Sequence, residues 1–159
     1  MYYYHNGILG TGFATQELIE PDGTGPVPNR LGTYELVAFT KHKYVNVPIG
    51  EGSFGKIERR ICGIFTGIGN FSFQAKLEPG ETCELPDNDE PNKCLIFDQY
   101  QEQGQDFIIN GKEYGLLLVM EVHRDEMEYA RQNGSSELLK ILKQKGVYPY
   151  SDLDRESVL

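Results

Sequence analysis

Residues 106–122 read DFIINGKEYGLLLVMEV, and they carry the strongest structural signal in the chain. Asn110–Gly111 separates two apolar runs, which predicts a β-hairpin because a type I′ turn needs positive φ at both central residues. The second run, residues 114–122, is almost entirely apolar, so we expect a central strand that is covered on both faces. The rest of the chain is therefore expected to build a sheet around this strand.

Two short helices are expected directly after this strand. Residues 124–134, RDEMEYARQNG, place acidic side chains in the first turn, where they favour the helix dipole, and end in an Asn–Gly pair. Residues 135–146, SSELLKILKQKG, begin with serines that can cap a helix and end in lysines and a glycine. The apolar side of this second helix is formed by Leu138, Leu139 and Leu142.

Upstream, the chain alternates between strands and loops. Residues 9–19 and 94–100 predict short strands, and the turn-rich segments 20–30 and 86–93 predict loops. Residues 32–42, GTYELVAFTKH, alternate in a way that predicts a strand with two apolar faces. One face carries Tyr34, Leu36 and Ala38, and the other carries Val37 and Phe39.

Residues 53–65, SFGKIERRICGIF, change to a helical period. Apolar side chains recur at i, i+4, i+7 and i+8, which is one stripe on a helix. Ser53 can act as the N-cap residue, and the glycine-rich run 67–70 is expected to end the helix. The stripe consists of Ile57, Ile61, Ile64 and Phe65.

The order of elements is strands, a helix, strands, a hairpin and two helices, which is not a regular βαβ alternation. We therefore expect a single α+β domain over residues 1–159, with a mixed, mostly antiparallel β-sheet and helices packed against it. A chain of 159 residues is long enough for one domain with a hydrophobic core.

Two short motifs resemble parts of a protein kinase, but their surroundings argue against phosphoryl transfer. Residues 49–57, IGEGSFGKI, have the G-x-G-x-x-G spacing of a glycine-rich loop, which in kinases is a hairpin over the ATP phosphates. Here a helical period follows instead. His123, Arg124 and Asp125 spell HRD, yet the position that should hold magnesium is Ala130. Both motifs are therefore expected to serve the fold, and a helix should begin close to the glycine-rich stretch.

Charge and composition limit the classes of function. The net charge of −9 and the pI near 4.8 argue against nucleic-acid binding, because the phosphate backbone favours a basic surface. The same charge suits the capture of a basic protein partner, and it also suits solubility alone. No apolar run approaches the roughly 20 residues of a membrane helix, and no secretory signal is visible. We expect a cytoplasmic protein without a membrane partner.

The cysteines and acidic runs match no metal or redox motif. Cys62, Cys83 and Cys94 have no zinc or redox spacing, so free thiols are expected, with a Cys83–Cys94 disulfide as the alternative. The acidic residues 87–90 lack the glycine and the closing glutamate of a calcium loop. We expect no metal, no cofactor and no catalytic constellation.

The C-terminal third resembles the bacterial suppressor-of-fused-like domain family. That family's pattern is an apolar strand, an acid-rich helix start, a glycine that ends the helix, a leucine-rich helix and a D-x-x-R tail. In the N-terminal part, YELVAFTK resembles the family's Glu-Leu strand, which places the pair at Glu35–Leu36. The C-terminal features fall at Leu116–Val122, Glu126, Gly134, Leu138–Leu142 and Asp152–Arg155.

This resemblance implies a non-enzymatic interaction domain with a mixed β-sheet flanked by helices. The eukaryotic relative binds and restrains a transcription factor, and the bacterial forms act as immunity proteins that neutralise a toxin, commonly a nuclease. For this chain the resemblance implies a protein partner, with a basic bacterial toxin as the leading candidate. The oligomeric state is left open.

Acidic side chains in two segments are candidates for contacts with such a partner. For Glu126 and Arg155 a structural role is the alternative, in which the carboxylate stabilises a helix N-terminus and the guanidinium holds the tail by an ion pair. The candidate contacts are Asp87, Asp89 and Glu90 in the loop, and Asp152, Asp154, Arg155 and Glu156 in the tail.

Two other functions stay open at this point. A hydrolase or transferase would assemble its site from dispersed residues, for example His123 with Glu35 or Cys62, and would show a deep pocket with His or Cys beside a carboxylate. A small-ligand regulatory module would also show a pocket. A broad acidic face without such a pocket favours the binding protein.

Overall fold

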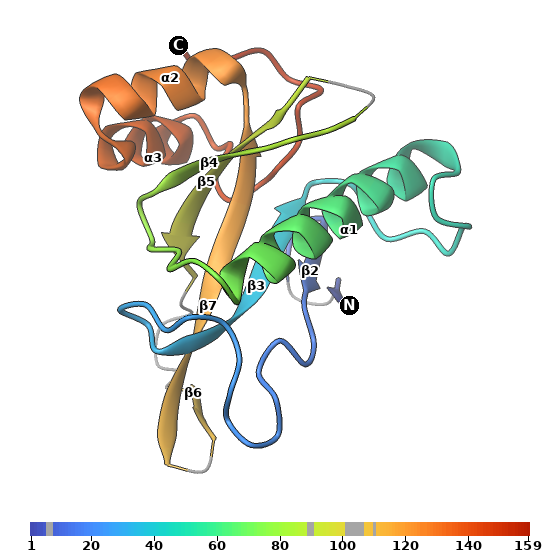
Figure 1. Cartoon of the computed structure of the whole chain (residues 1–159). Helices are drawn as coiled ribbons and strands as arrows, with labels where there is room; N and C mark the ends of the chain where they lie inside the picture. The colour runs from blue at the N-terminus through green and yellow to red at the C-terminus, as the bar shows by residue number, and fades with distance from the viewer. Residues whose placement is uncertain (6–7, 89–90, 101–106, 110) are drawn as a thin grey trace.

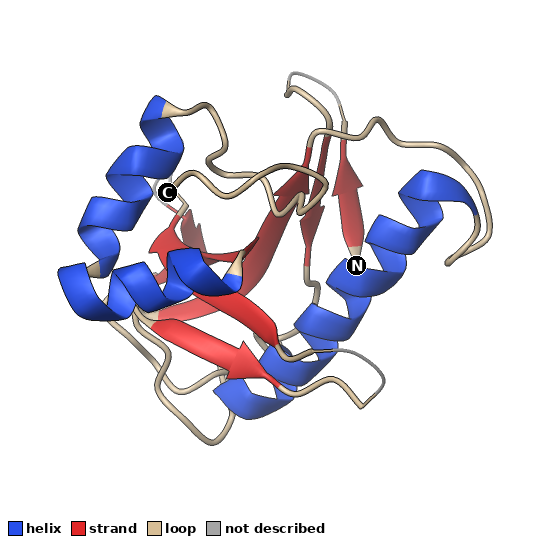
Figure 2. Cartoon of the chain, turned by 90° about the horizontal axis from the view of Figure 1, so that it is seen from above, coloured by secondary structure: helices blue, strands red, loops and turns tan. Residues whose placement is uncertain are grey.

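The computed structural model describes residues 1–5, 8–88, 91–100, 107–109 and 111–159. In this part of the chain, seven strands form one sheet and three helices lie against it (Figures 1 and 2). The strands are β1 (Tyr2–Tyr4), β2 (Thr11–Ala14), β3 (Thr33–Thr40), β4 (Thr82–Leu85), β5 (Lys93–Gln99), β6 (Phe107–Ile109) and β7 (Lys112–Val122). The helices are α1 (Gly52–Ser72), α2 (Arg124–Asn133) and α3 (Ser135–Gln144).

The strand order is β1-β2-β3-β7-β5-β4, and β6 pairs with β7 outside this path. Only the β3–β7 pair among these is parallel, and the other pairs are antiparallel. The expected α+β class with a mixed, mostly antiparallel sheet is therefore confirmed. β7 lies between β3 and β5, which also confirms the central strand expected from its apolar run.

The hairpin expected before the central strand is present. β6 and β7 pair antiparallel, with Ile109 opposite Lys112. Gly111 has φ of +77°, as a tight turn of this kind requires. Asn110, the other turn residue, lies outside the described residues.

The sheet buries apolar side chains on both faces because its central strands alternate between two cores. On β3, Tyr34, Leu36 and Ala38 face the core under α1, whereas Val37 and Phe39 face the core under α2 and α3. On β7 and β5 the same division holds. Leu117, Val119, Leu95 and Phe97 join the first core, and Leu118, Met120, Cys94 and Ile96 join the second. Figure 2 shows the sheet between α1 on one side and the α2–α3 pair on the other.

Helix α1 begins where expected but ends later. Its N-cap residue is Glu51 and not Ser53, and Glu51 makes no side-chain capping bond. The glycine run 67–70 does not stop the helix, which continues to Ser72. A Cβ on Gly67 would lie 2.7 Å from Leu85 Cδ1, so this glycine lets β4 pack closely against the helix. The glycines are therefore spacers at a helix–sheet contact and not a terminator.

The kinase-like stretch forms a turn followed by a helix. Gly50 and Gly52 adopt φ of +90° and +63°, and the Gly50 amide donates to the Gly55 carbonyl at 2.8 Å. A Cβ on Gly55 would lie 2.8 Å from the Pro48 carbonyl oxygen. The prediction that a helix begins here is confirmed, and the two-stranded hairpin of a nucleotide-binding loop is not formed.

The two C-terminal helices agree with their predicted positions. Leu138, Leu139 and Leu142 are all buried against the sheet. The serines at the start of α3 do not cap it, because the N-cap residue is Gly134. Gly134 has φ of +98° and no side chain that could accept a capping hydrogen bond. Gly134 thus ends α2 and begins α3 with almost no connecting loop.

The three cysteines are free thiols. β4 and β5 pair so that Cys94 lies opposite Glu84 and not opposite Cys83. Since neighbouring residues of a strand point to opposite faces, Cys83 packs on the α1 core and Cys94 in the other core. The disulfide alternative is therefore wrong for a geometric reason.

Candidate functional site

The structure brings the two predicted acidic segments to one end of the molecule. Arg124, the first residue of α2, lies 3.3 Å from Glu84 at the end of β4, just before the acidic loop. Glu126, in the same helical turn, pairs with Arg155 of the tail. The end of β4 and the tail therefore both contact the first turn of α2, which lies at the top of Figure 1.

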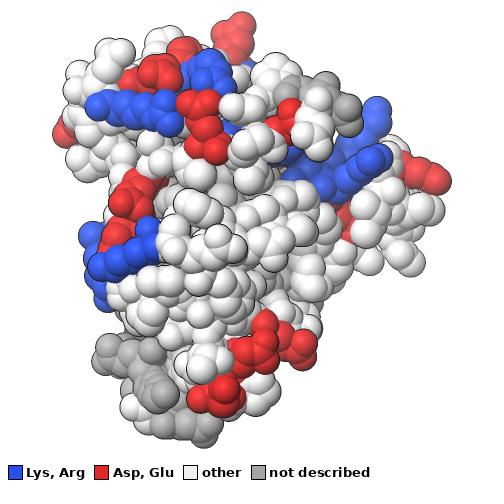
Figure 3. All heavy atoms as spheres, viewed as in Figure 1, with Lys and Arg blue, Asp and Glu red and all other residues white. Residues whose placement is uncertain are grey.

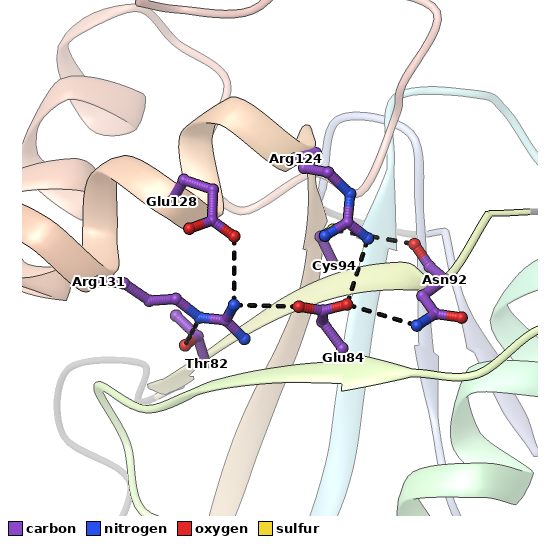
Figure 4. Close-up of polar contacts among 7 residues, drawn as sticks. All are labelled: Thr82, Glu84, Asn92, Cys94, Arg124, Glu128 and Arg131. Carbon is purple, nitrogen blue, oxygen red and sulfur yellow. Dashed lines mark hydrogen bonds and ion pairs between the residues drawn. The ribbon is translucent and has the colours of Figure 1, made fainter.

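Glu84 is the centre of the charge cluster beside the acidic loop (Figure 4). Its carboxylate accepts hydrogen bonds from Arg124 at 3.3 Å and Arg131 at 3.0 Å, and Arg131 also reaches Glu128 at 3.2 Å. The bonds from Arg124, Arg131 and Asn92 lower the pKa of Glu84 to about 2. The edge strand β4 is thereby held to α2 through charged side chains.

One acidic residue of the loop already has a partner within the fold. Asp87 forms an ion pair with Lys93, the first residue of β5. Asp89 and Glu90 lie outside the described residues. The structure thus assigns Asp87 a local partner across the loop and leaves the contact role of all three acids a prediction.

Glu126 and Arg155 form a buried anchor for the tail. Glu126 has no exposed surface, and both its oxygens accept bonds from the Arg155 guanidinium, at 2.6 and 2.7 Å. The amides of His123 and Val158 each donate to it at 2.9 Å. Burial raises the pKa of Glu126, but Arg155 and the two amides lower it by more than burial raises it. The pKa of Glu126 in the folded protein is therefore below its usual value. This geometry supports the structural alternative for both residues.

The family-pattern residue Glu35 also has a structural geometry. Its carboxylate accepts bonds from the Thr15 hydroxyl at 2.5 Å and the Ile19 amide at 3.0 Å. It therefore ties the loop after β2 to the β3 strand. Gly134, the remaining family-pattern position, supplies the positive φ between α2 and α3 described above.

Of the three tail acids, one is hydrogen-bonded within the fold and two are exposed. Asp152 accepts bonds from the Lys41 amide at 2.8 Å and from the Thr40 hydroxyl, which fixes the tail to the end of β3. Asp154 lies 3.2 Å from the His42 ring, yet 69% of its side chain is exposed. Glu156 is also exposed. Asp154 and Glu156 are thus the tail carboxylates most accessible to a partner.

A cavity of about 240 Å³ lies between the tail and the start of α1. Its charged floor is the pair of Arg60 and Glu121, joined by two bonds of 2.6 Å, with only 2% of the Glu121 side chain exposed. We call this space the tail cavity. It is lined by His42, Ser53, Ile57, Arg60, Ile61, Glu121, Ser151, Asp152, Leu153 and Asp154.

Arg60, Glu121 and His42 could not be predicted as neighbours from the sequence. They come from α1, the end of β7 and the segment after β3, so no local spacing joins them. The one available signal was Glu121 itself, because a carboxylate inside the apolar run LLLVMEV needs a buried cation.

The residues named as examples for an enzyme site are not assembled, although the tail cavity places the His42 ring 3.2 Å from Asp154. Glu35 pairs with Leu116 near the middle of β7, and His123 follows the end of that strand, about 23 Å further on at roughly 3.3 Å per residue. The His123 ring contacts the Arg155 carbonyl at 2.9 Å, and Cys62 contacts the Met1 sulfur at 3.7 Å. Burial raises the pKa of the Cys62 thiol, which keeps it protonated.

Neither a metal-binding cluster nor a membrane-spanning helix is present within the described ranges. No group of three or more His, Cys, Asp or Glu side chains there is arranged to hold a metal ion. No helix in the same part of the chain is long and apolar enough to cross a membrane.

Comparison with known proteins places this architecture in a family. The chain is similar to a chain of the Sufu–Fu complex crystal structure, with a TM-score of 0.59 and 14% identity over 99% of this chain and 75% of that chain. At this identity the likeness shows the fold alone. No protein with a curated description matches the sequence. The model of the suppressor of fused protein (SUFU) family matches residues 32–156, most of the chain, and the chain therefore belongs to the suppressor of fused family.

Proposed function

We propose that this chain is a non-enzymatic protein-binding domain that neutralises a bacterial toxin by direct contact, with a basic nuclease as the leading partner class. The observation that carries the proposal is membership of the suppressor of fused family, together with a fold shared with a chain of a protein complex, that of Sufu and Fu. The second support is charge. With 24 acidic against 15 basic residues, the chain complements a basic partner and steers its approach.

The proposed contact surface is the end of the molecule around the N-terminus of α2. Asp154 and Glu156 are the leading contacts because both are exposed. Asp87, Asp152 and Arg155 have internal partners, so in this proposal they hold the loop and tail in place for the exposed acids. Asp89 and Glu90 stay in the proposal as candidates from the sequence, since both lie outside the described residues.

The proposal places this complex in the cytoplasm. Three free cysteines agree with a reducing compartment, where disulfides do not persist. The inhibitor would then act on the toxin after the toxin has reached the cytoplasm, and it would need no chemistry of its own.

Co-expression with candidate nuclease toxins, chosen from the genes beside its own, tests this function. We expect the chain to restore growth and to co-purify with the toxin domain. A catalytically dead toxin provides the control, since it should form the same complex without a growth defect. Absence of both protection and a complex would contradict the proposal.

A further inference from the structure

The tail cavity combines apolar walls with an acidic rim. Ile57 and Ile61 of α1 and Leu153 of the tail contribute apolar side chains to its lining. Asp152 and Asp154 flank Leu153 and border the same space. Apolar surface beside carboxylates suits a ligand with an aliphatic body and a cationic end.

The charges that line the tail cavity favour a cation. Three carboxylates, Glu121, Asp152 and Asp154, face one guanidinium, that of Arg60, which leaves a formal charge of −2 with His42 neutral. The Arg60–Glu121 pair compensates itself through two hydrogen bonds. The acidic excess of this lining therefore resides in Asp152 and Asp154, at the same end of the molecule as the proposed contact surface. On their other side these two carboxylates border a neighbouring hollow that Lys41 and Arg155 also line.

The size of the cavity fits one long side chain. A protein cavity of about 150 Å³ already accommodates benzene, and this one measures about 240 Å³. An aliphatic stem would lie between Ile57 and Leu153, and its charged head would reach the Asp154 carboxylate. A carboxylate or phosphate ligand would face the excess negative charge and be repelled.

We propose that the tail cavity receives an arginine or lysine side chain of the partner protein. The inference rests on the proposed function in taking a basic protein as the source of that side chain. It goes beyond that function by assigning the cavity floor to Arg60 and Glu121, the walls to Ile57, Ile61 and Leu153, and the charge recognition to Asp154. The partner would thus insert a cationic side chain between α1 and the tail.

Small probes test the cavity without the partner. n-Butylguanidinium, its neutral analogue n-butylurea and the anion butanoate are titrated into protein with labelled Ile and Leu methyl groups, and NMR shifts are followed. We expect the guanidinium to shift the methyl signals of Ile57, Ile61 and Leu153 with saturation in the millimolar range, and the other two probes to bind several-fold more weakly. Equal binding of the urea, or no saturable shift, would overturn the assignment.

Two pairs of variants locate the interaction. Asp154→Asn should weaken guanidinium binding about two- to fivefold, the range of an exposed ion pair, whereas Glu137→Gln, at an exposed acid of α3 outside the cavity lining, should leave it unchanged. Ser53→Trp should block the cavity from an exposed position, and Asn70→Trp, at the other end of α1, should not. Thermal unfolding shows whether each variant keeps the fold. Equal effects within either pair would refute the cavity as the site.

The outcome for the cavity can be separated from the outcome for the function. Probe binding without toxin neutralisation would uphold the cation site and remove the proposed function. Neutralisation without probe binding would uphold the function and remove the cavity assignment. Once a toxin complex is obtained, Ser53→Trp should weaken it relative to Asn70→Trp, and an unchanged complex would show that no side chain enters the cavity.

Discussion

At the level of single residues, the buried carboxylate of Glu126 shows how charge is used inside this fold. It accepts four hydrogen bonds, two from Arg155 and one each from the amides of His123 and Val158. These bonds satisfy an orphan amide at the start of α2 and fasten the tail across 29 residues of sequence. A pattern of residues that resembles a binding motif is therefore also a structural anchor.

Replacement of Arg155 should destabilise the protein strongly. Arg155→Met leaves Glu126 buried without its cation, and removal of one partner of a buried pair costs about 3–5 kcal/mol. Urea unfolding of the variant measures the loss. Arg131→Met is the control, because its pair with Glu84 is exposed to solvent and should matter much less. Similar losses for both variants would contradict the assigned role of Glu126.

The same carboxylate predicts a dependence of stability on pH. Because the pKa of Glu126 is lowered in the folded state, its contribution is fully present above the unfolded pKa of about 4.3 and is lost as pH falls through the folded pKa. The difference in unfolding free energy between the natural protein and Glu126→Gln should therefore shrink as the solution is acidified below about pH 5. A difference that stays constant or grows on acidification would oppose this sign.

At the level of elements, α1 shows that glycines in a helix can have opposite effects. A Cβ on Gly63 meets no atom within 4 Å, whereas a Cβ on Gly55 would press on the Pro48 carbonyl oxygen at 2.8 Å. The first glycine carries only the entropic disadvantage of its residue type, and the second permits a close backbone contact.

A pair of alanine substitutions tests this distinction. Gly63→Ala should stabilise the protein by up to about 1 kcal/mol, since alanine is the better helix former. Gly55→Ala should destabilise it by about 1–3 kcal/mol, because the Pro48 carbonyl is backbone and must shift. Thermal or urea unfolding compares the two variants directly. The same sign for both would mean that the packing around Gly55 is looser than the structure indicates.

The elements with strong periodicity could be predicted from the sequence. The alternation in β3 and the apolar run of β7 predicted both strands and their burial on both faces. Burial on both faces of a strand requires apolar residues at nearly every position, which is visible in the sequence. The end of α1 was missed because Gly67 packs against Leu85, a contact that sequence spacing does not reveal. β1 was missed because three consecutive tyrosines show no alternation, although only the middle one packs on the core.

The candidate site was less predictable than the fold. The tail acids could be named from the sequence. That Asp152 is hydrogen-bonded to the end of β3 while Asp154 stays exposed is known only from the folded structure. The tail cavity requires α1, β7 and the tail together, so only the folded structure brings Arg60 to Glu121.

At the level of the whole molecule, the arrangement of charge matters more than its sum. Figure 3 shows basic and acidic side chains intermixed around the α2 end, while red side chains at the lower end of this view have no blue neighbours. The exposed acids Glu17 and Glu20 lie in the loop between β2 and β3, which Figure 1 places at that lower end. In this view the lower end is therefore the uniformly acidic surface, whereas our proposal assigns the partner to the surface of mixed charge that carries the tail.

The binding affinity for the neighbouring toxin, measured by calorimetry at low and at physiological salt, tests the central claim most directly. We predict a tight one-to-one complex that weakens with salt, as charge steering requires. Combined Asp154→Lys and Glu156→Lys should weaken it about tenfold or more, and the matched pair Glu17→Lys and Glu20→Lys should change it far less. No measurable complex, or a larger loss from the second pair, would contradict the account.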